Sequence, residues 1–270
     1  LNLGTADVTA MYPSIPLRVG LESLKYFLLH IKQSDPDLVQ FILAAANWIL
    51  TSMMVRLGPW CFTQIKGTAM GTNFAPEYAN IVLAVAEART FSIPFQFGSN
   101  QQPPQDAFTI KDPTGGPFSM HLTFYGRYLD DILYVTDEPL DFVPDKFWKE
   151  LIESISLSTE LTLSAISFGR KIDFLDLSIS ITGKDKIEYS IFYKPSNTHL
   201  HLPPFSQHSK AVSRAWPVAE FRRIVDRCSS MEIARPYILN FISTLADRGF
   251  PSKLILQNLH VAMKPRTKKR

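Results

Sequence analysis

The stretch YGRYLDDILYV at residues 125–135 places Asp130 and Asp131 side by side within a run of aromatic and aliphatic residues. Such a run is typical of buried β-structure, so the stretch predicts a hairpin with the two aspartates at its turn. Two adjacent carboxylates in that setting repel each other and lose hydration. The site therefore needs a compensating positive charge, and a pair of hard oxygen ligands of this kind suits Mg²⁺.

A third carboxylate is expected to join this pair. Asp7 lies in TADVTAMYPSIP, residues 5–16, where an apolar strand ends before a turn marked by two prolines. We expect this strand to pack beside the hairpin. Two divalent ions held there about 3.5–4 Å apart would stabilise the attacking and leaving oxygens of a phosphoryl transfer.

Three stretches of the chain resemble a known family. ADVTAMYPSIP, QIKGTAMGTNFAPEYAN and YGRYLDDILYV are similar to motifs A, B and C of reverse transcriptases, in that order. Downstream, IDFLDLSI and FYKPSNTHLHLPPFSQHSK are most similar to Penelope-like retroelements, a branch related to telomerase. The resemblance covers nearly the whole chain except residues 92–118. It implies an α+β fold: a right-hand polymerase palm, with helices packed on an antiparallel sheet, then a helical thumb, the fingers being largely missing.

The resemblance also assigns roles to the acidic residues and their neighbours. It implies that Asp7 and Asp130 hold two Mg²⁺ ions, for which Mn²⁺ could substitute, with help from the backbone carbonyl of Val8. Asp131 completes the acidic cluster. Tyr12 occupies the position of the family's sugar gate, where a ring beneath the incoming ribose would collide with a 2′-hydroxyl and favour deoxynucleotides.

Further residues match the family's nucleotide-binding and primer-binding positions. Met70 and Gly71 match the motif B turn that lies against the nascent base pair, and glycine suits a close backbone approach. Lys66 would either reach a phosphate or remain solvated. The stretch FYKPSNTHLHLPP matches the primer grip. Its candidate contacts to the primer backbone are Lys194, His199 and His201.

Charge is distributed unevenly along the chain. Residues 1–190 hold 14 Lys and Arg against 21 Asp and Glu, a net charge of −7, whereas residues 191–270 hold 14 against 4, a net charge of +10. A basic tail of this kind suggests contact with a polyanion, although solvated surface helices would have the same composition. The candidate contacts to the phosphates of a template–primer duplex are Arg214, Arg222, Arg223 and Arg227.

Sequence patterns divide the chain into three expected regions. Residues 1–190 form the palm with motifs A to D and an insertion at 92–118, residues 191–215 form the primer-grip region, and residues 216–270 form a helical, basic thumb that could resemble a helix-turn-helix. The expected helices cover residues 17–32, 38–55, 75–87, 145–158, 217–228, 231–248 and 252–263, the second of them buried and the sixth capped by Ser229. A strand meander is expected over residues 161–194.

Taken together, these features predict the RNA-directed DNA polymerase domain of a retroelement, a nucleotidyltransferase that binds an RNA template, a DNA primer, their duplex and dNTPs. The chain has only two cysteines, which favours a reducing, intracellular setting. Polar residues interrupt its long apolar stretch, so no membrane partner is expected. The basic end KPRTKKR suggests the nucleus. Three alternatives stay open: a non-catalytic DNA-binding module built on the tail, an RNA-templated RNA polymerase, and a decayed element copy.

Overall fold

The computed structural model describes residues 1–91, 109–111, 119–137, 161–183 and 185–264. It divides into two compact units, Leu1–Gly169 and Arg170–Arg270. The helix expected over residues 145–158 lies outside the described residues, as does most of the expected insertion at 92–118, of which only strand β4 (Thr109–Lys111) is described.

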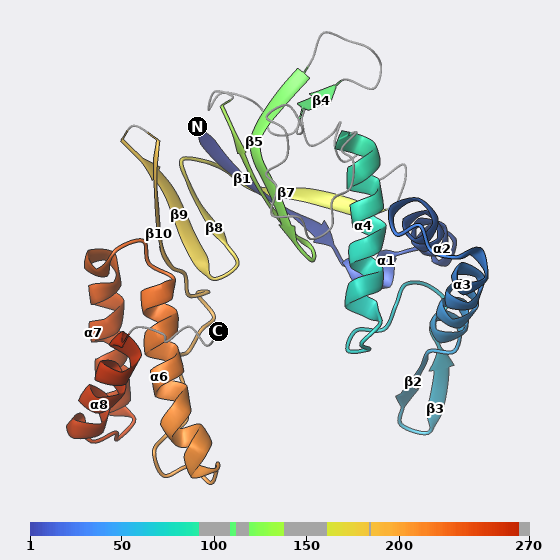
Figure 1. Cartoon of the computed structure of the whole chain (residues 1–270). Helices are drawn as coiled ribbons and strands as arrows, with labels where there is room; N and C mark the ends of the chain where they lie inside the picture. The colour runs from blue at the N-terminus through green and yellow to red at the C-terminus, as the bar shows by residue number, and fades with distance from the viewer. Residues whose placement is uncertain (92–108, 112–118, 138–160, 184, 265–270) are drawn as a thin grey trace. The chain divides into compact units, whose positions relative to one another are not determined.

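The first unit is built on a five-stranded antiparallel sheet (Figure 1). Its strand order is β4-β5-β6-β1-β7, in which β1 is Asn2–Thr9, β5 is Ser119–Tyr128, β6 is Asp131–Thr136 and β7 is Thr162–Gly169. Strand β1 therefore lies between two strands that come much later in the chain, and it pairs antiparallel with both. The β5–β6 hairpin predicted from the sequence is confirmed, and so is the position of β1 beside it.

Helices cover one face of this sheet. They are α1 (Met11–Ser14), α2 (Leu17–Tyr26), which continues into the π-helix η1 (Phe27–Ile31), α3 (Pro36–Thr51) and α4 (Ala75–Phe91). Apolar residues of α4 and of the strands form the core with exposed fractions of 1% or less: Ala6, Val8, Tyr78, Ala79, Val82, Leu83, Ala86, Ile132 and Tyr134. Because Ala6 and Val8 point into this core, the residue between them faces the other side of the sheet.

Two glycines leave room for the tyrosines of this core. A Cβ atom on Gly4 would lie 1.9 Å from Cζ of Tyr134, and one on Gly20 would lie 1.7 Å from the hydroxyl oxygen of Tyr78. Both separations are far below contact distance, so each ring packs directly on a glycine backbone.

The hairpin β2 (Met54–Leu57) and β3 (Trp60–Thr63) turns at Gly58, as the sequence predicts. All eight of its strand residues are exposed.

The expectation that the preceding helix is buried is wrong in part, because Phe41 and Trp48 of α3 are 71% and 70% exposed. Within the described residues, none of the helices combines the length and the apolar character needed to span a membrane.

The second unit places three helices next to a three-stranded antiparallel sheet. The strands are β8 (Lys171–Phe174), β9 (Leu177–Thr182) and β10 (Lys186–Ile191), and the helices are α6 (Lys210–Asp226), α7 (Met231–Asp247) and α8 (Ser252–Met263). Their shared core includes Ile191, Phe221, Ile224, Phe241, Leu245 and Ile255. The predicted primer-grip region and the predicted basic tail both fall within this unit.

Three details of the second half differ from the sequence predictions. The expected meander is divided, since β7 joins the first unit's sheet and β8–β10 form their own. Helix α6 begins at Lys210 rather than after Pro217, because the Ser209 side chain caps it at the N–H of Val212. The cap of α7 is Ser230 instead of Ser229, whose hydroxyl accepts from the N–H of Tyr189 on β10.

Candidate functional site

The β5–β6 turn carries the paired aspartates. Tyr128 pairs with Asp131 across the hairpin, so Leu129 and Asp130 form a two-residue turn. Leu129 has a φ of 56°, a left-handed conformation that is uncommon for a residue with a branched side chain. The backbone N–H of Val8 donates to the carbonyl oxygen of Asp130 over 3.0 Å. The turn is thus tied to β1 at the residue that follows Asp7.

Asp7 and the paired aspartates come together at this end of the sheet. Asp7 is in register with Asp131 across the antiparallel β1–β6 pair, so their side chains leave the sheet on the same face, opposite the α4 core. Burial raises the pKa of Asp7, and the negative charge of Asp130 raises it further. Carboxylates from three separate sequence positions therefore gather where β1, β5 and β6 meet.

The donor chemistry of this site fits a hard divalent cation. A cation would offset the burial and the negative charge of Asp130 that raise the pKa of Asp7, and Mg²⁺ commonly uses one or two protein carboxylates together with waters and substrate phosphates. Within the part of the chain that the structure describes, no cluster of three or more His, Cys, Asp or Glu residues has the geometry to hold a metal by itself. Ligands from a substrate would have to complete the coordination.

The loop that was predicted to be motif B packs directly against α1. The N–H groups of Gly67 and Thr68 donate to the carbonyl oxygens of Ile15 and Tyr12 over 3.1 and 2.8 Å. A Cβ on Gly67, which has a φ of 74°, would lie 2.4 Å from Cα of Pro13. Glycine is required here by both conformation and space. These contacts fix the loop that follows β3 to the segment that follows Asp7.

A pocket of about 480 Å³ opens beside this contact. It is lined by Tyr12, Met70, Gly71, Thr72, Asn73, Pro76 and Glu77. Gly71 has a φ of 92° and open space around its Cα, and Met70 is 76% exposed. The structure therefore brings together Tyr12, Met70 and Gly71, three of the predicted nucleotide-binding residues. Lys66, the fourth, is exposed and lies outside the lining of this pocket.

Tyr12 links the pocket to the acidic residues. Burial raises the pKa of its phenol, and the nearby Asp130 and Tyr128 raise it further. The effect of Asp130 means that the tyrosine ring lies within electrostatic range of the turn. Tyr12 thus both lines the pocket and lies near the turn that carries Asp130.

Sequence reasoning missed a buried network behind this site. The guanidinium of Arg127 forms two hydrogen bonds with the carboxylate of Glu87 on α4, at 2.6 and 3.2 Å, and the hydroxyl of Tyr125 donates to the same carboxylate over 2.7 Å. The side chains of Arg127 and Glu87 are 9% and 15% exposed. Burial alone would lower the pKa of Arg127, but Glu87 prevails and raises it. An arginine inside a predicted apolar strand was the available signal, because a buried charge requires a partner.

The predicted primer-grip residues lie in the second unit. Lys194 is exposed. His199 has a φ of 51° and its N–H donates to the side chain of Asn197 over 2.9 Å. The ring of His201 stacks on Trp216 with centroids 5.1 Å apart and meets the edge of Phe241, and burial lowers its pKa. His201 therefore packs as part of the aromatic core, and His199 is half-buried with its ring against Tyr193, so only Lys194 of the three is exposed.

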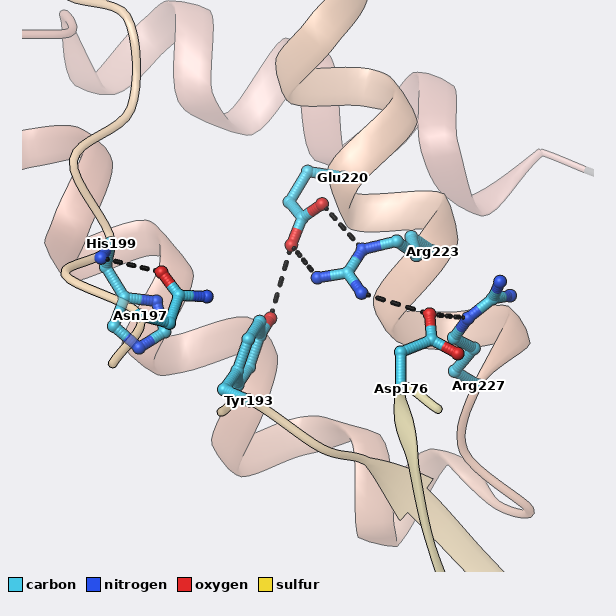
Figure 2. A network of polar contacts seen from close by, with 7 residues as sticks. All are labelled: Asp176, Tyr193, Asn197, His199, Glu220, Arg223 and Arg227. Atoms are coloured by element: carbon cyan, nitrogen blue, oxygen red, sulfur yellow. Dashed lines mark hydrogen bonds and ion pairs between the residues drawn. The ribbon is translucent and has the colours of Figure 1, made fainter. Parts of the chain in front are cut away.

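Two of the predicted duplex-binding arginines are engaged in ion pairs (Figure 2). Arg223 binds both oxygens of Glu220 at 2.8 Å and reaches Asp176 at 3.3 Å, and Arg227 also pairs with Asp176. Tyr193 donates to Glu220 over 3.2 Å. Burial would raise the pKa of Glu220, but the hydrogen bonds and charge of Arg223 prevail and lower it.

Three of the four arginines predicted to bind a duplex nevertheless share one surface. A pocket of about 290 Å³ is lined by Ala219, Arg222, Arg223, Asp226 and Arg227. Arg222 donates to the carbonyl of Val261 over 3.3 Å, and Arg214 is exposed. Three of the four arginines thus lie together, at a site where acidic residues partly balance their charge.

Comparison with known proteins supports the fold. The chain matches no family model and no curated protein. Telomerase from Candida albicans, solved in complex with a TWJ fragment of telomeric RNA, is 13% identical to this chain, with a TM-score of 0.55 over 96% of this chain and 42% of that one. Apo telomerase from Candida tropicalis is also 13% identical, with a TM-score of 0.48 over 97% and 45%.

This chain therefore spans less than half of the length of either telomerase. At 13% identity, the likeness to the Candida albicans enzyme concerns the fold alone. The chain has a mixed α/β, reverse-transcriptase-like fold with antiparallel sheets.

Proposed function

We propose that this chain is the catalytic part of an RNA-directed DNA polymerase. The observation that carries the proposal is the meeting of Asp7 with the Asp130–Asp131 turn, beside a pocket lined by Tyr12 and Gly71. These residues belong to three stretches that are far apart in the chain and that resemble motifs A, B and C of reverse transcriptases in sequence order. The reverse-transcriptase-like fold of the solved neighbour supports the same assignment.

Each group at the site would have a defined task. Asp7 and Asp130, with the carbonyl of Val8, would hold Mg²⁺, and Asp131 would add negative charge next to them. The bound ions would activate the primer 3′-hydroxyl and stabilise the charge on the α-phosphate and the departing pyrophosphate. Tyr12 would lie beneath the deoxyribose of the incoming nucleotide.

The reacting base pair and the rest of the primer–template duplex would contact different surfaces. Met70 and Gly71 would lie against the nascent base pair, where the open space around Gly71 leaves room for a substrate. In the second unit, Lys194 and the arginines of α6 would contact phosphates of the primer and of the duplex. The first unit would then be the palm, and helices α6–α8 the thumb. The telomeric RNA bound by the neighbour is consistent with nucleic-acid partners.

Primer extension tests this proposal. The chain is supplied with an RNA template annealed to a DNA primer, dNTPs and Mg²⁺, and labelled primer extension is followed. Asp130→Ala should reduce extension by about 10³-fold or more, because a metal-held charge at the reacting phosphate contributes several kcal/mol. Asp137→Ala removes an exposed carboxylate just beyond β6 and should leave the rate unchanged. Equal activity of the two variants would refute the assignment.

A further inference from the structure

The side chain of Arg127 connects helix α4 to the turn that carries Asp130. Its Nε donates to Glu87 at 2.6 Å. One terminal nitrogen donates to the side-chain oxygen of Asn80 at 3.0 Å and to the carbonyl oxygen of Leu129 at 2.8 Å. The other donates to Glu87 at 3.2 Å and to the backbone carbonyl of Asn80 at 3.5 Å. All five N–H donors of the guanidinium therefore have acceptors.

The contact with Leu129 is the one that concerns the site. The carbonyl of Leu129 belongs to the same peptide plane as the N–H of Asp130, so holding this oxygen fixes the orientation of that peptide. Leu129 is in the left-handed region, with a φ of 56°. Such a conformation costs about 1–2 kcal/mol and persists only where its surroundings impose it. The guanidinium provides a charge-assisted hydrogen bond that helps to hold it.

The stability of the folded chain does not by itself explain why an ion pair between Arg127 and Glu87 is buried here. Burying two charges costs several kcal/mol each before their attraction is counted, and apolar residues of similar volume often stabilise a core as well or better. The planar guanidinium, however, holds groups in several fixed directions at the same time. At this position the Arg127 guanidinium donates hydrogen bonds to two residues of α4 and to one residue of the turn.

We propose that Arg127 is a positioning residue, whose guanidinium ties the Leu129 carbonyl to Glu87 and Asn80 and thereby sets the place of the Asp130 carboxylate. The inference rests on the proposed polymerase function for its consequence on rate. Its structural content, the placement of a metal-binding carboxylate, can be measured separately.

The test compares Arg127→Lys with Tyr125→Phe in the full chain. Lysine keeps the charge opposite Glu87 but cannot span helix and turn at once. We expect kcat for primer extension to fall about 100-fold, as for a reacting group displaced by about 1 Å, while KM for dNTP changes less than about threefold. Tyr125→Phe removes a hydrogen bond of the same network without touching the turn, so its kcat should match that of the wild type.

Manganese binding supplies a readout that does not depend on activity. Titration of Mn²⁺ without substrate, followed by electron paramagnetic resonance, should show binding weakened about 10-fold in Arg127→Lys and unchanged in Tyr125→Phe. If Arg127→Lys does not fold, the double variant Glu87→Gln/Arg127→Gln replaces it, because it leaves no unpaired buried charge. The same losses are expected for the double variant.

The outcomes separate the two proposals. An active wild type, with kcat and Mn²⁺ affinity unchanged in the Arg127 variant, would leave the polymerase assignment intact and overturn the positioning role. An inactive wild type whose Mn²⁺ binding depends on Arg127 would overturn the polymerase and keep the positioning role. A wild type that neither extends a primer nor binds Mn²⁺ would overturn both.

Discussion

Both units of the molecule contain an arginine–carboxylate network, but the two networks differ in their access to solvent. In the first unit, the side chains of Arg127 and Glu87 are 9% and 15% exposed. In the second, the side chain of Glu220 is also 15% exposed, but those of Arg223, Asp176 and Arg227 are 32%, 35% and 40% exposed. The first network is therefore buried throughout, whereas the part of the second around Asp176 is open to water.

Solvent access decides what such a network can do. A buried ion pair such as Arg127–Glu87 cannot exchange partners without leaving a charge buried and unpaired. Such a pair therefore suits a role in holding other groups in fixed positions. An open pair is worth about 1 kcal/mol or less and is weakened by salt. Its arginines can therefore exchange a carboxylate for a phosphate at little cost. The buried network suits the positioning of catalytic groups, and the open one suits a surface that takes up and releases nucleic acid.

The largest expected effect tests the buried network. Glu87→Ala should lower the free energy of unfolding by about 3–5 kcal/mol, because it leaves the Arg127 guanidinium buried without its carboxylate. Asp176→Ala should lower it by about 1 kcal/mol or less, since water can solvate Arg223 and Arg227. Urea denaturation measures both values. Similar losses in the two variants would mean that the networks do not differ in the way their exposure indicates.

An intermediate effect concerns nucleic-acid binding by the open network. Asp176→Asn should tighten binding of an RNA–DNA duplex by up to about fivefold at low salt, because Arg223 and Arg227 lose a competing carboxylate worth about 1 kcal/mol at most. Fluorescence anisotropy across a salt series measures this. Glu188→Gln, which makes the same charge change at the pair with Lys186, is the matched control. Equal tightening in both variants would indicate a general charge effect and not release of these arginines.

The smallest effect is the response of Glu220, the less exposed carboxylate of the second unit's network, to acid. The pKa of Glu220 is lowered below its ordinary value of 4.5, chiefly because Arg223 outweighs burial, with smaller contributions from Tyr193 and His201. A lowered folded-state pKa contributes stability above about pH 4.5 that is lost as pH falls through the lower value. We expect this loss to be about 1 kcal/mol or less.

Thermal unfolding between pH 6 and pH 3 checks the expectation. In Glu220→Gln, this part of the pH dependence should disappear, whereas Glu22→Gln, at an exposed pair with Arg18, should retain it. A Glu220→Gln profile that parallels the wild type would contradict a stabilising role for the carboxylate.

The sequence was sufficient to predict much of the first unit. Strand β1, the β5–β6 hairpin and the turn at Gly58 each have a local signal, namely an apolar run, paired aspartates between apolar flanks, or a glycine before a proline. The approach of Asp7 to the paired aspartates was predicted because an apolar strand that ends at a polar turn was expected to pack beside the hairpin, and β1 does pair with β6 there.

Other features depend on partners that no local pattern specifies. Glu87 lies 40 residues before Arg127, and only the packing of α4 on the sheet brings them together. The same is true of Asp176 and Arg227, 51 residues apart. The start of α6 was misplaced because Pro217 reads as a helix boundary, yet the structure continues the helix through it. Tertiary contacts outweigh local preference at each of these places.

The β2–β3 hairpin has a practical consequence for handling this chain. Val55, Leu57, Trp60 and Phe62 lie on one face of it and are 56%, 71%, 68% and 55% exposed. A two-stranded ribbon is marginally stable by itself in water, and its outer edges can accept strands from other molecules. Concentrated samples should therefore precipitate through this ribbon first, and polar replacements at Trp60 and Phe62 would be the most direct way to improve solubility.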